Sequence, residues 1–101
     1  MDVKREVTVG YTTDANAMVT VKPNDGNGIE VVYKDVSGVI PQFVRKRTKQ
    51  VEDYINSICE ENGVKDAYFY IEDAASLDCT IKHFISDALA KATAEEQRRF
   101  N

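Results

Sequence analysis

The spacing of the apolar residues is the feature that most limits how this chain can fold, because its period changes along the sequence. Four short segments alternate apolar and polar residues, which is typical of strands with one buried face. Two longer segments repeat apolar residues at spacings of three, four and seven, which is typical of amphipathic helices. The expected strands are 6–9, 17–22, 29–34 and 67–71, and the helices begin near Ile40 and Leu77. The pattern therefore predicts the order βββαβα.

Segments rich in turn-forming residues separate the first three strands. The segment 10–16 is small and polar, and the segment 23–28 contains the pairs Asp25-Gly26 and Asn27-Gly28. Such pairs favour positive φ and are typical of hairpins. We therefore expect the first three strands to form an antiparallel meander, while the neighbours of the fourth strand stay open.

Both helices have recognisable ends. Pro41 suits the first turn of the long helix, where its missing N–H is not needed, and Gly63 suits the C-terminal cap. Asp73 or Ser76 can cap the last helix. The expected apolar stripe of the long helix is Ile40, Phe43, Val44, Val51, Tyr54, Ile55, Ile58 and Cys59. The expected stripe of the last helix is Leu77, Ile81, Phe84, Ile85, Ala88, Leu89 and Ala92.

The length of 101 residues suits one small domain. The simplest packing of these elements is an α+β two-layer sandwich, in which a mostly antiparallel four-stranded sheet carries both helices on one face. We predict a single domain over residues 1–93 and a polar C-terminal tail over residues 94–101, which frays.

Charge and cysteine content exclude several classes of function. Thirteen Lys and Arg against seventeen Asp and Glu give a net charge of −4, which argues against a nucleic-acid or membrane-surface partner. The chain shows no apolar run near the ~20 residues of a membrane span and no signal-like N-terminal segment. Two cysteines, Cys59 and Cys79, favour a reducing cytoplasm, although one disulfide between them stays open.

The residues alone indicate no catalytic or metal centre. His83 has Asp87 one helical turn away, but no nucleophile is identifiable beside it, so a solvated helix residue is the expectation. Two cysteines and one histidine do not make a four-ligand metal site. The basic run 45–49 and five tyrosines suggest RNA binding, yet helical charges spread around the helix and acidic residues follow. We expect a solvated helix face there, with a protein-docking surface as the alternative.

One segment goes further. Residues 73–82 read DAASLDCTIK and resemble the signature of the citrate lyase acyl carrier protein, the gamma chain of that complex. In that family a Gly-Ala-Leu-Asp-Cys-Thr-Ile-Lys-type stretch opens the last helix. Val9-Gly10, a short polar turn and the segment 18–21 are also similar to the first hairpin of the family. The resemblance covers nearly the whole chain, and these two segments are its specific part.

The resemblance implies a role. In the family a CoA-derived prosthetic group, of the phosphoribosyl-dephospho-CoA type, is joined by a phosphodiester to a serine in the first hairpin turn. Its thiol carries acyl groups between the acyl-transferase and lyase subunits, so the carrier itself is not a catalyst. The resemblance further implies that the last helix contacts the large subunits. The residues expected at these contacts are Leu77, Asp78, Lys82 and Lys91, with solvated lysines as the alternative for the last two.

The chain departs from the family at two places. Asp14 stands at the position of the modified serine and has no hydroxyl, while Thr13 and Thr12 carry the nearest ones. His83-Phe84 stands where the family has Ala-Arg, which removes a cation and adds an exposed or docking aromatic. Three interpretations stay open: a carrier whose serine was replaced, a paralogue that lost the arm and acts as an interaction or assembly subunit, and a carrier that uses Thr13.

Overall fold

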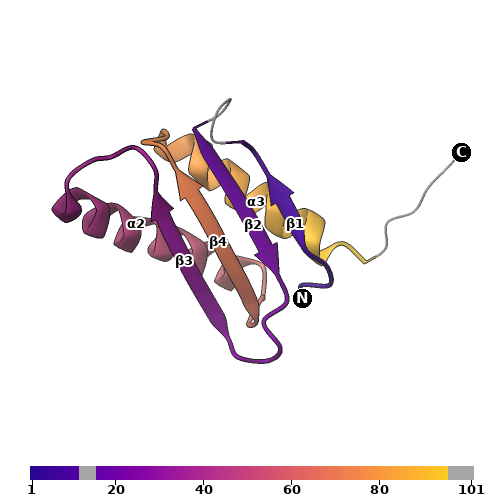
Figure 1. Cartoon of the computed structure of the whole chain (residues 1–101). Coiled ribbons are helices and arrows are strands. Elements are labelled where there is room, and N and C mark those ends of the chain that lie inside the picture. Colours follow the sequence, from indigo (N-terminus) through magenta and orange to yellow (C-terminus); the bar gives the residue numbers. More distant parts are fainter. Residues whose placement is uncertain (12–15, 96–101) are drawn as a thin grey trace, which may run out of the picture.

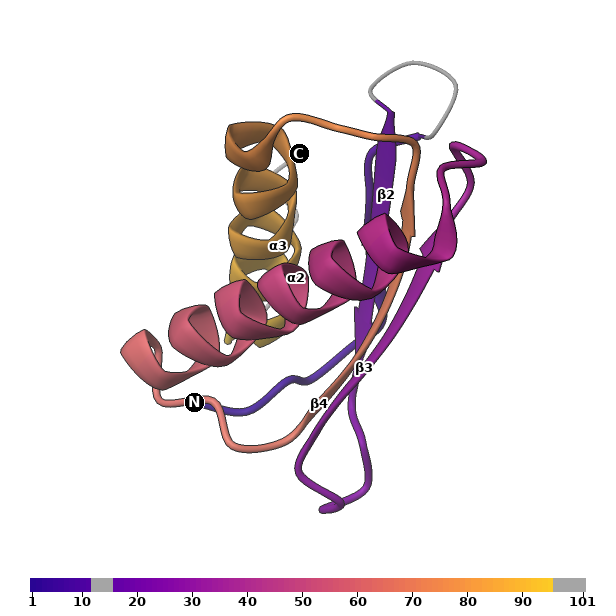
Figure 2. The ribbon, with the colours of Figure 1, turned by 90° about the vertical axis from the view of Figure 1, so that its left-hand side faces the viewer.

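A four-stranded sheet carries two helices on one of its faces (Figures 1 and 2). The structure is a computed structural model and describes residues 1–11 and 16–95. The elements are β1 (Val7–Val9), β2 (Ala17–Lys22), β3 (Ile29–Asp35), α2 (Pro41–Glu61), β4 (Ala67–Asp73) and α3 (Asp78–Thr93). The predicted order βββαβα and the α+β class are confirmed. Residues 96–101 of the predicted tail lie outside the described residues.

The sheet has the strand order β1-β2-β4-β3, so the predicted three-stranded meander is wrong. β4 lies between β2 and β3; it is antiparallel to β2 and parallel to β3. Two of the three pairings are antiparallel, which agrees with a mostly antiparallel sheet. Asp25 and Gly26 have the expected positive φ, but their segment connects strands that are not neighbours.

The long helix α2 explains the place of β4. Two parallel neighbouring strands need a crossover of a dozen or more residues, usually a helix. α2 supplies it with 21 residues, beginning at Pro41 and ending just before Gly63, whose φ is +67°. Asp66, directly ahead of β4, then fixes the loop between β2 and β3. Its carboxylate accepts hydrogen bonds from the backbone N–H groups of Asn24 and Gly28 at 2.9 and 3.1 Å.

The core lies between the helices and the covered face of the sheet. Alternate residues of the two central strands point into it and are fully buried, and both helices close it from the other side (Figure 2). Its fully buried side chains include Val19, Val21, Phe69, Ile71, Ile55, Ile81 and Ile85. Burial of a side chain of this size contributes about 1.5–3 kcal/mol, so these rows account for the two-layer architecture.

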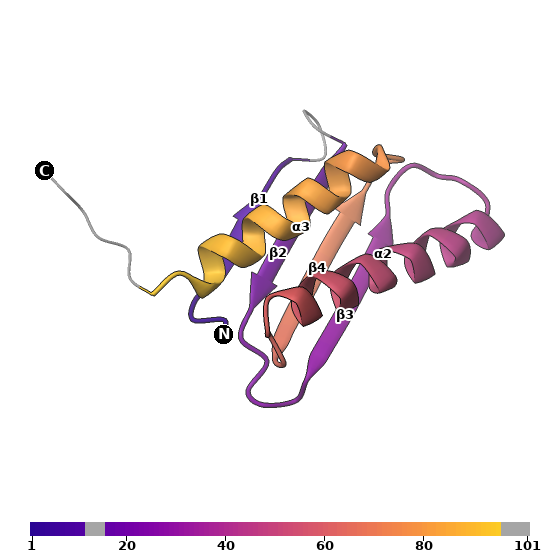
Figure 3. The same ribbon diagram turned by 180° about the vertical axis from the view of Figure 1, so that it is seen from behind.

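Only the second half of α2 packs on this core. Its buried residues are Val51, Ile55 and Cys59, whereas Ile40 and Phe43 from the predicted stripe are exposed. The first turns of α2 extend beyond the edge strand β3 (Figure 3). The prediction of one apolar stripe along the whole helix is therefore wrong for its N-terminal part. Within residues 1–11 and 16–95, neither helix combines the length and apolar character that crossing a membrane requires.

The start of α3 differs from the prediction. Leu77 takes the N-cap position without a side-chain hydrogen bond, so neither Asp73 nor Ser76 caps the helix. Leu77 is also 70% exposed and does not belong to the buried stripe, which begins at Ile81. Asp73 instead ends β4 as a fully buried residue with partners of its own.

Candidate functional site

Three connections of the chain meet at one end of the sheet, together with the first turns of both helices (Figures 1 and 2). Asp73 at the end of β4 is paired with Asp35 at the end of β3 and with Ala17 at the start of β2. The turn between β1 and β2 therefore lies at this end, beside the segments that lead into α2 and α3. We call this end, from which these three connections leave, the turn end.

The described ends of the turn are Tyr11 and Asn16. Tyr11 is 68% exposed, and Asn16 has a φ of +64°. The backbone N–H of Ala74 donates to the Asn16 carbonyl oxygen at 2.7 Å, which ties the turn to the loop ahead of α3. The predicted attachment residues Thr12, Thr13 and Asp14 lie outside the described residues.

Gly10 anchors the base of the turn against α3. Its φ is +86°, and a Cβ at this position would lie 2.5 Å from the Ala17 carbonyl oxygen and 2.6 Å from Cε2 of Phe84. Only glycine fits such a close approach. Phe84 is half-buried and packs against the core, which confirms its place in the expected stripe of the last helix and contradicts the expectation of an exposed aromatic. The Phe84 ring thus packs against Gly10 at the base of the turn.

A buried carboxylate, Asp73, organises the turn end. The Tyr33 hydroxyl donates to its Oδ2 at 2.7 Å, and the Arg47 Nε donates to the same oxygen at 3.1 Å. The Ser76 backbone N–H donates to Oδ1 at 2.9 Å. Arg47 also donates to Asp78 and to the Ser76 carbonyl oxygen. One guanidinium thus joins α2, the end of β4 and the start of α3.

The pKa shifts follow from this network. Burial alone would raise the pKa of Asp73, but hydrogen bonds from Ser76, Tyr33 and Arg47 outweigh it and lower this pKa below its usual value. Burial and the bond to Asp73 raise the pKa of Tyr33. The hydrogen bond from Arg47 lowers the pKa of Asp78. Asp73 is therefore a buried anion at neutral pH, held by one cation and two neutral donors.

The pairing of Asp73 with Arg47 was not predicted from the residue pattern. Asp73 and Arg47 are 26 residues apart, and the pattern placed them in a helix cap and a solvated basic run. The available signal is weak: Asp73 continues the buried alternation Ala67, Phe69, Ile71 by one more step.

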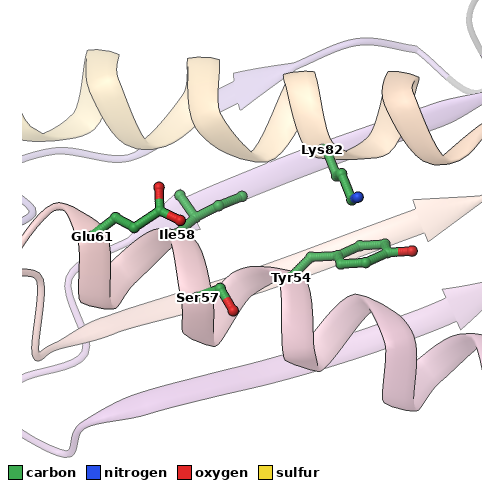
Figure 4. A pocket seen from close by; sticks show the side chains of 5 residues that line it. All are labelled: Tyr54, Ser57, Ile58, Glu61 and Lys82. Carbon is green, nitrogen blue, oxygen red and sulfur yellow. The ribbon is translucent and has the colours of Figure 1, made fainter.

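A groove of about 270 Å³ runs between the two helices (Figure 4). Tyr54, Ser57, Ile58 and Glu61 line it from α2, and Lys82 lines it from α3. The Lys82 Nζ lies over the Tyr54 ring, 4.4 Å from the ring centroid, in a cation–π contact. Lys82 is thus held against α2 although its side chain is exposed.

The structure does not bring the four predicted partner contacts together. Leu77 and Asp78 lie at the turn end, and Lys82 follows one turn later in α3. Lys91 lies in the last turn, about 20 Å along the helix from Asp78. Its Nζ pairs with Asp87 at 3.0 Å, a bond that engages the carboxylate expected beside His83. Leu77 and Asp78 are therefore the two that lie at the turn end.

The tyrosines, the cysteines and a metal site are the remaining candidates from the sequence. Tyr68 and Tyr70 lie on the uncovered face of the sheet, whereas Tyr33 lies on the face that the helices cover. The tyrosines therefore form no common stacking surface. Cys59 is buried, which raises the pKa of its thiol to about 11, and Cys79 is exposed; both are free. In the described parts of the chain, no group of three or more His, Cys, Asp or Glu is placed to hold a metal ion.

Comparisons with known proteins point to one family. A family model described as the malonate decarboxylase delta subunit (MdcD) matches residues 4–92. The citrate lyase acyl carrier protein of Halothermothrix orenii is 37% identical over 98 residues, which cover 95% of this chain and 97% of that protein. The citrate lyase acyl carrier protein of Streptococcus mutans is 34% identical, and the match covers 95% of this chain and 88% of that protein. The citrate lyase acyl carrier protein of Treponema denticola is 32% identical, and the match covers 91% of this chain and 97% of that protein.

Proposed function

This chain belongs to the acyl carrier protein family that these matches define, and from this membership we propose that it is the carrier subunit of a citrate-lyase-type complex. The observation that carries the proposal is the extent of the match, since 95% of the chain aligns with 97% of a citrate lyase acyl carrier protein. The chain itself would not catalyse a reaction. Its partners would be the lyase and acyl-transferase subunits, with no nucleic acid and no membrane involved.

The proposal assigns the attachment of a CoA-derived prosthetic group, of the phosphoribosyl-dephospho-CoA type, to the turn between β1 and β2. That group, when bound, supplies the thiol that holds the acyl group. A phosphodiester to the protein needs a hydroxyl. Asp14, at the matching position, has none and does not fit, whereas Thr13 and Thr12 fit chemically. Gly10 and Phe84 below the turn, and Ala74 beside it, would hold its ends while its tip reaches the large subunits.

We also propose a cytoplasmic location for this complex. The free thiols of Cys59 and Cys79 support it, because a reducing compartment keeps cysteines unpaired. The single-domain assignment over residues 1–93 is part of the same proposal. It agrees with the extent of the core, which runs from Val3 to Ala92.

Asp14 favours a second candidate function. A family member without the hydroxyl at this position would keep the fold and its contacts but carry no arm. It would then act as a non-modified interaction or assembly subunit.

The intact mass of the protein from its native cells tests the two functions, followed by peptide mapping of residues 10–22. A cofactor-sized addition on Thr13 or Thr12 would support the carrier function and exclude the non-modified one. An unmodified mass, with the attaching enzyme shown to be present and active, would exclude the carrier function and leave the assembly subunit.

A variant series identifies the attachment residue. Thr13→Val and Thr12→Val remove one hydroxyl each while keeping the β-branched shape, so only one of them should abolish the addition. Asp14→Ser restores the serine of the family. If only this variant gains the added mass, the attaching enzyme recognises the fold and the missing hydroxyl alone explains an unmodified wild type.

A further inference from the structure

The segment between β3 and α2, together with the first turn of α2, exposes four apolar side chains in eight residues. Val36, Val39, Ile40 and Phe43 have between 42% and 56% of their surface exposed, which the core does not require. Single exposed apolar residues are ordinary, but several of them close together in one connection are typical of an interaction site. We call these four residues the apolar patch.

The surrounding backbone holds the apolar patch in place. The Val36 N–H donates to the Asp73 carbonyl oxygen at 2.9 Å, which continues the pairing of β3 with β4. The Asp35 carboxylate accepts hydrogen bonds from the Ser37 hydroxyl and the Gly38 N–H at 2.8 and 3.2 Å. Arg47 fixes the following turns of α2 to Asp73. These bonds hold the backbone on both sides of the apolar patch, so that a partner that covers it meets a largely preformed surface.

Positive charge accompanies the apolar patch on a chain whose net charge is −4. Arg45 and Lys46 follow Phe43 on the projecting turns of α2 and are exposed. Neither forms an ion pair with any residue in the ranges 1–11 and 16–95, whereas the neighbouring Arg47 is neutralised by Asp73 and Asp78. A complementary partner surface is apolar with carboxylates at its border.

The apolar patch also belongs to the turn end. It follows the end of β3, and the strand pairing places that end in the same row as the start of β2. A protein that covers the patch would thus lie at the same end of the sheet as the turn between β1 and β2, with the end of β4 between them. We propose that the apolar patch, with Arg45 and Lys46, docks onto a larger subunit of the complex through an acidic-bordered apolar groove. This inference rests on the proposed function, because it names the surface that brings the turn to that subunit.

Binding of the 101-residue chain to purified lyase and acyl-transferase subunits of a citrate-lyase-type complex from the same organism tests the inference. Phe43→Gln should weaken the dissociation constant for one of them about tenfold or more, as truncation of a central interface aromatic does. The matched control Val32→Thr changes an apolar residue of 41% exposure on the uncovered face of the sheet. It should leave the dissociation constant within about twofold of the wild-type value. Circular dichroism checks that both variants fold.

A charge-reversal pair tests the complementarity. Lys46→Glu should weaken binding several-fold at low salt and less at high salt, because added ions screen the attraction. Lys65→Glu makes the same change at the opposite end of the sheet, just ahead of β4, and should have no such effect.

The outcomes separate the two proposals. If the wild-type chain binds neither subunit, the proposed function fails and the docking inference fails with it. If the wild type binds but Phe43→Gln and Lys46→Glu bind equally well, only the docking inference is overturned. Self-association of the wild type that Phe43→Gln abolishes would assign the patch to a second copy of the chain and likewise overturn it.

Discussion

At the scale of single residues, the interaction of Arg47 with Asp73 has the largest consequences. Asp73 is fully buried, and Arg47 is its one cationic partner among the described residues. Removal of one member of a buried ion pair leaves the other desolvated and unpaired, which costs about 3–5 kcal/mol. The pair therefore fixes α2 and the turn end relative to the sheet.

Arg47→Met should lower the free energy of unfolding at pH 7 by about 3 kcal/mol, measured by urea denaturation. The matched control Lys49→Met removes an exposed ion pair with Asp53 and should change it by less than about 0.5 kcal/mol. An equal loss in both variants would contradict the assignment of Arg47.

The contribution of Asp73 to the free energy of unfolding depends on pH. The pKa of Asp73 is lowered in the folded chain, so its contribution is present above its unfolded pKa of about 4. That contribution is lost as the pH falls through the lower folded value. Without Arg47, one of the bonds that favour the carboxylate is lost, so the pKa of Asp73 is lowered less and acidification costs the variant less. The stability gap between wild type and Arg47→Met should therefore narrow below about pH 4.

Gly10→Ala tests the contact beneath the turn. The added Cβ would meet the Ala17 carbonyl oxygen and the Phe84 ring, and φ is positive as well. We expect a loss of roughly 2–3 kcal/mol from overpacking and backbone strain together, measured by thermal unfolding. Gly26→Ala is the matched control, because its φ is +81° with nothing within 4 Å of the added atom. It should cost about 1 kcal/mol from φ alone.

The sequence pattern predicted some of these residue roles and missed others. The positive φ expected at Gly63 could be predicted because a glycine past the end of a helix has one common role. The partner of Asp73 could not, because it comes from α2 and only the folded chain brings the two together. For the same reason the spacing predicted Phe84 in the apolar stripe of its helix but not its contact with Gly10, because nothing in that helix shows that a glycine from the turn packs on its ring.

At the scale of elements, α2 has two unlike halves. Val51, Ile55 and Cys59 are buried, while the first three turns contribute no buried residue. Periodicity predicted the helix itself, because apolar spacing sets which residues share a face. It could not predict where along the helix that face loses its partner, since this depends on the width of the sheet below.

Two alanine variants should show this difference. Ile55→Ala should lower the free energy of unfolding by about 2–5 kcal/mol, because it opens a cavity in the core. Ile40→Ala, which removes the same atoms from a residue that is 51% exposed, should change it by less than about 0.5 kcal/mol. Chemical denaturation measures both, and similar losses would mean that the start of α2 is packed in solution.

At the scale of the whole molecule, the position of β4 sets how stability is distributed. β4 is paired on both sides and its inward residues are fully buried, whereas β1 has three residues and one neighbour. We therefore expect the backbone amides of β4 to exchange with solvent most slowly and those of β1 fastest. Hydrogen exchange followed by NMR measures this order, and equal protection of β1 would contradict the strand order.

The strand order was the part of the fold that the pattern could not supply. Alternation states which residues face the core but not which strand lies alongside, so the meander was the simplest arrangement. The length of α2 is a signal that could have corrected it, because a helix of 21 residues returns the chain to the starting end of β3. A parallel neighbour for β3 then follows from the ordinary geometry of strand–helix–strand units.

The central position of β4 also determines the order in which the chain can acquire structure during synthesis. β2, at residues 17–22, pairs with residues 68–73, so its inner edge has no partner until about fifty more residues have been made. β3 waits for the same strand. β1 and β2 can pair with each other early, but the inner edges of β2 and β3 have no partner until β4 has been made, so the four-stranded sheet is completed late. A chain that stops before Ala67 has β1, β2 and β3 but lacks the strand that joins β3 to the other two.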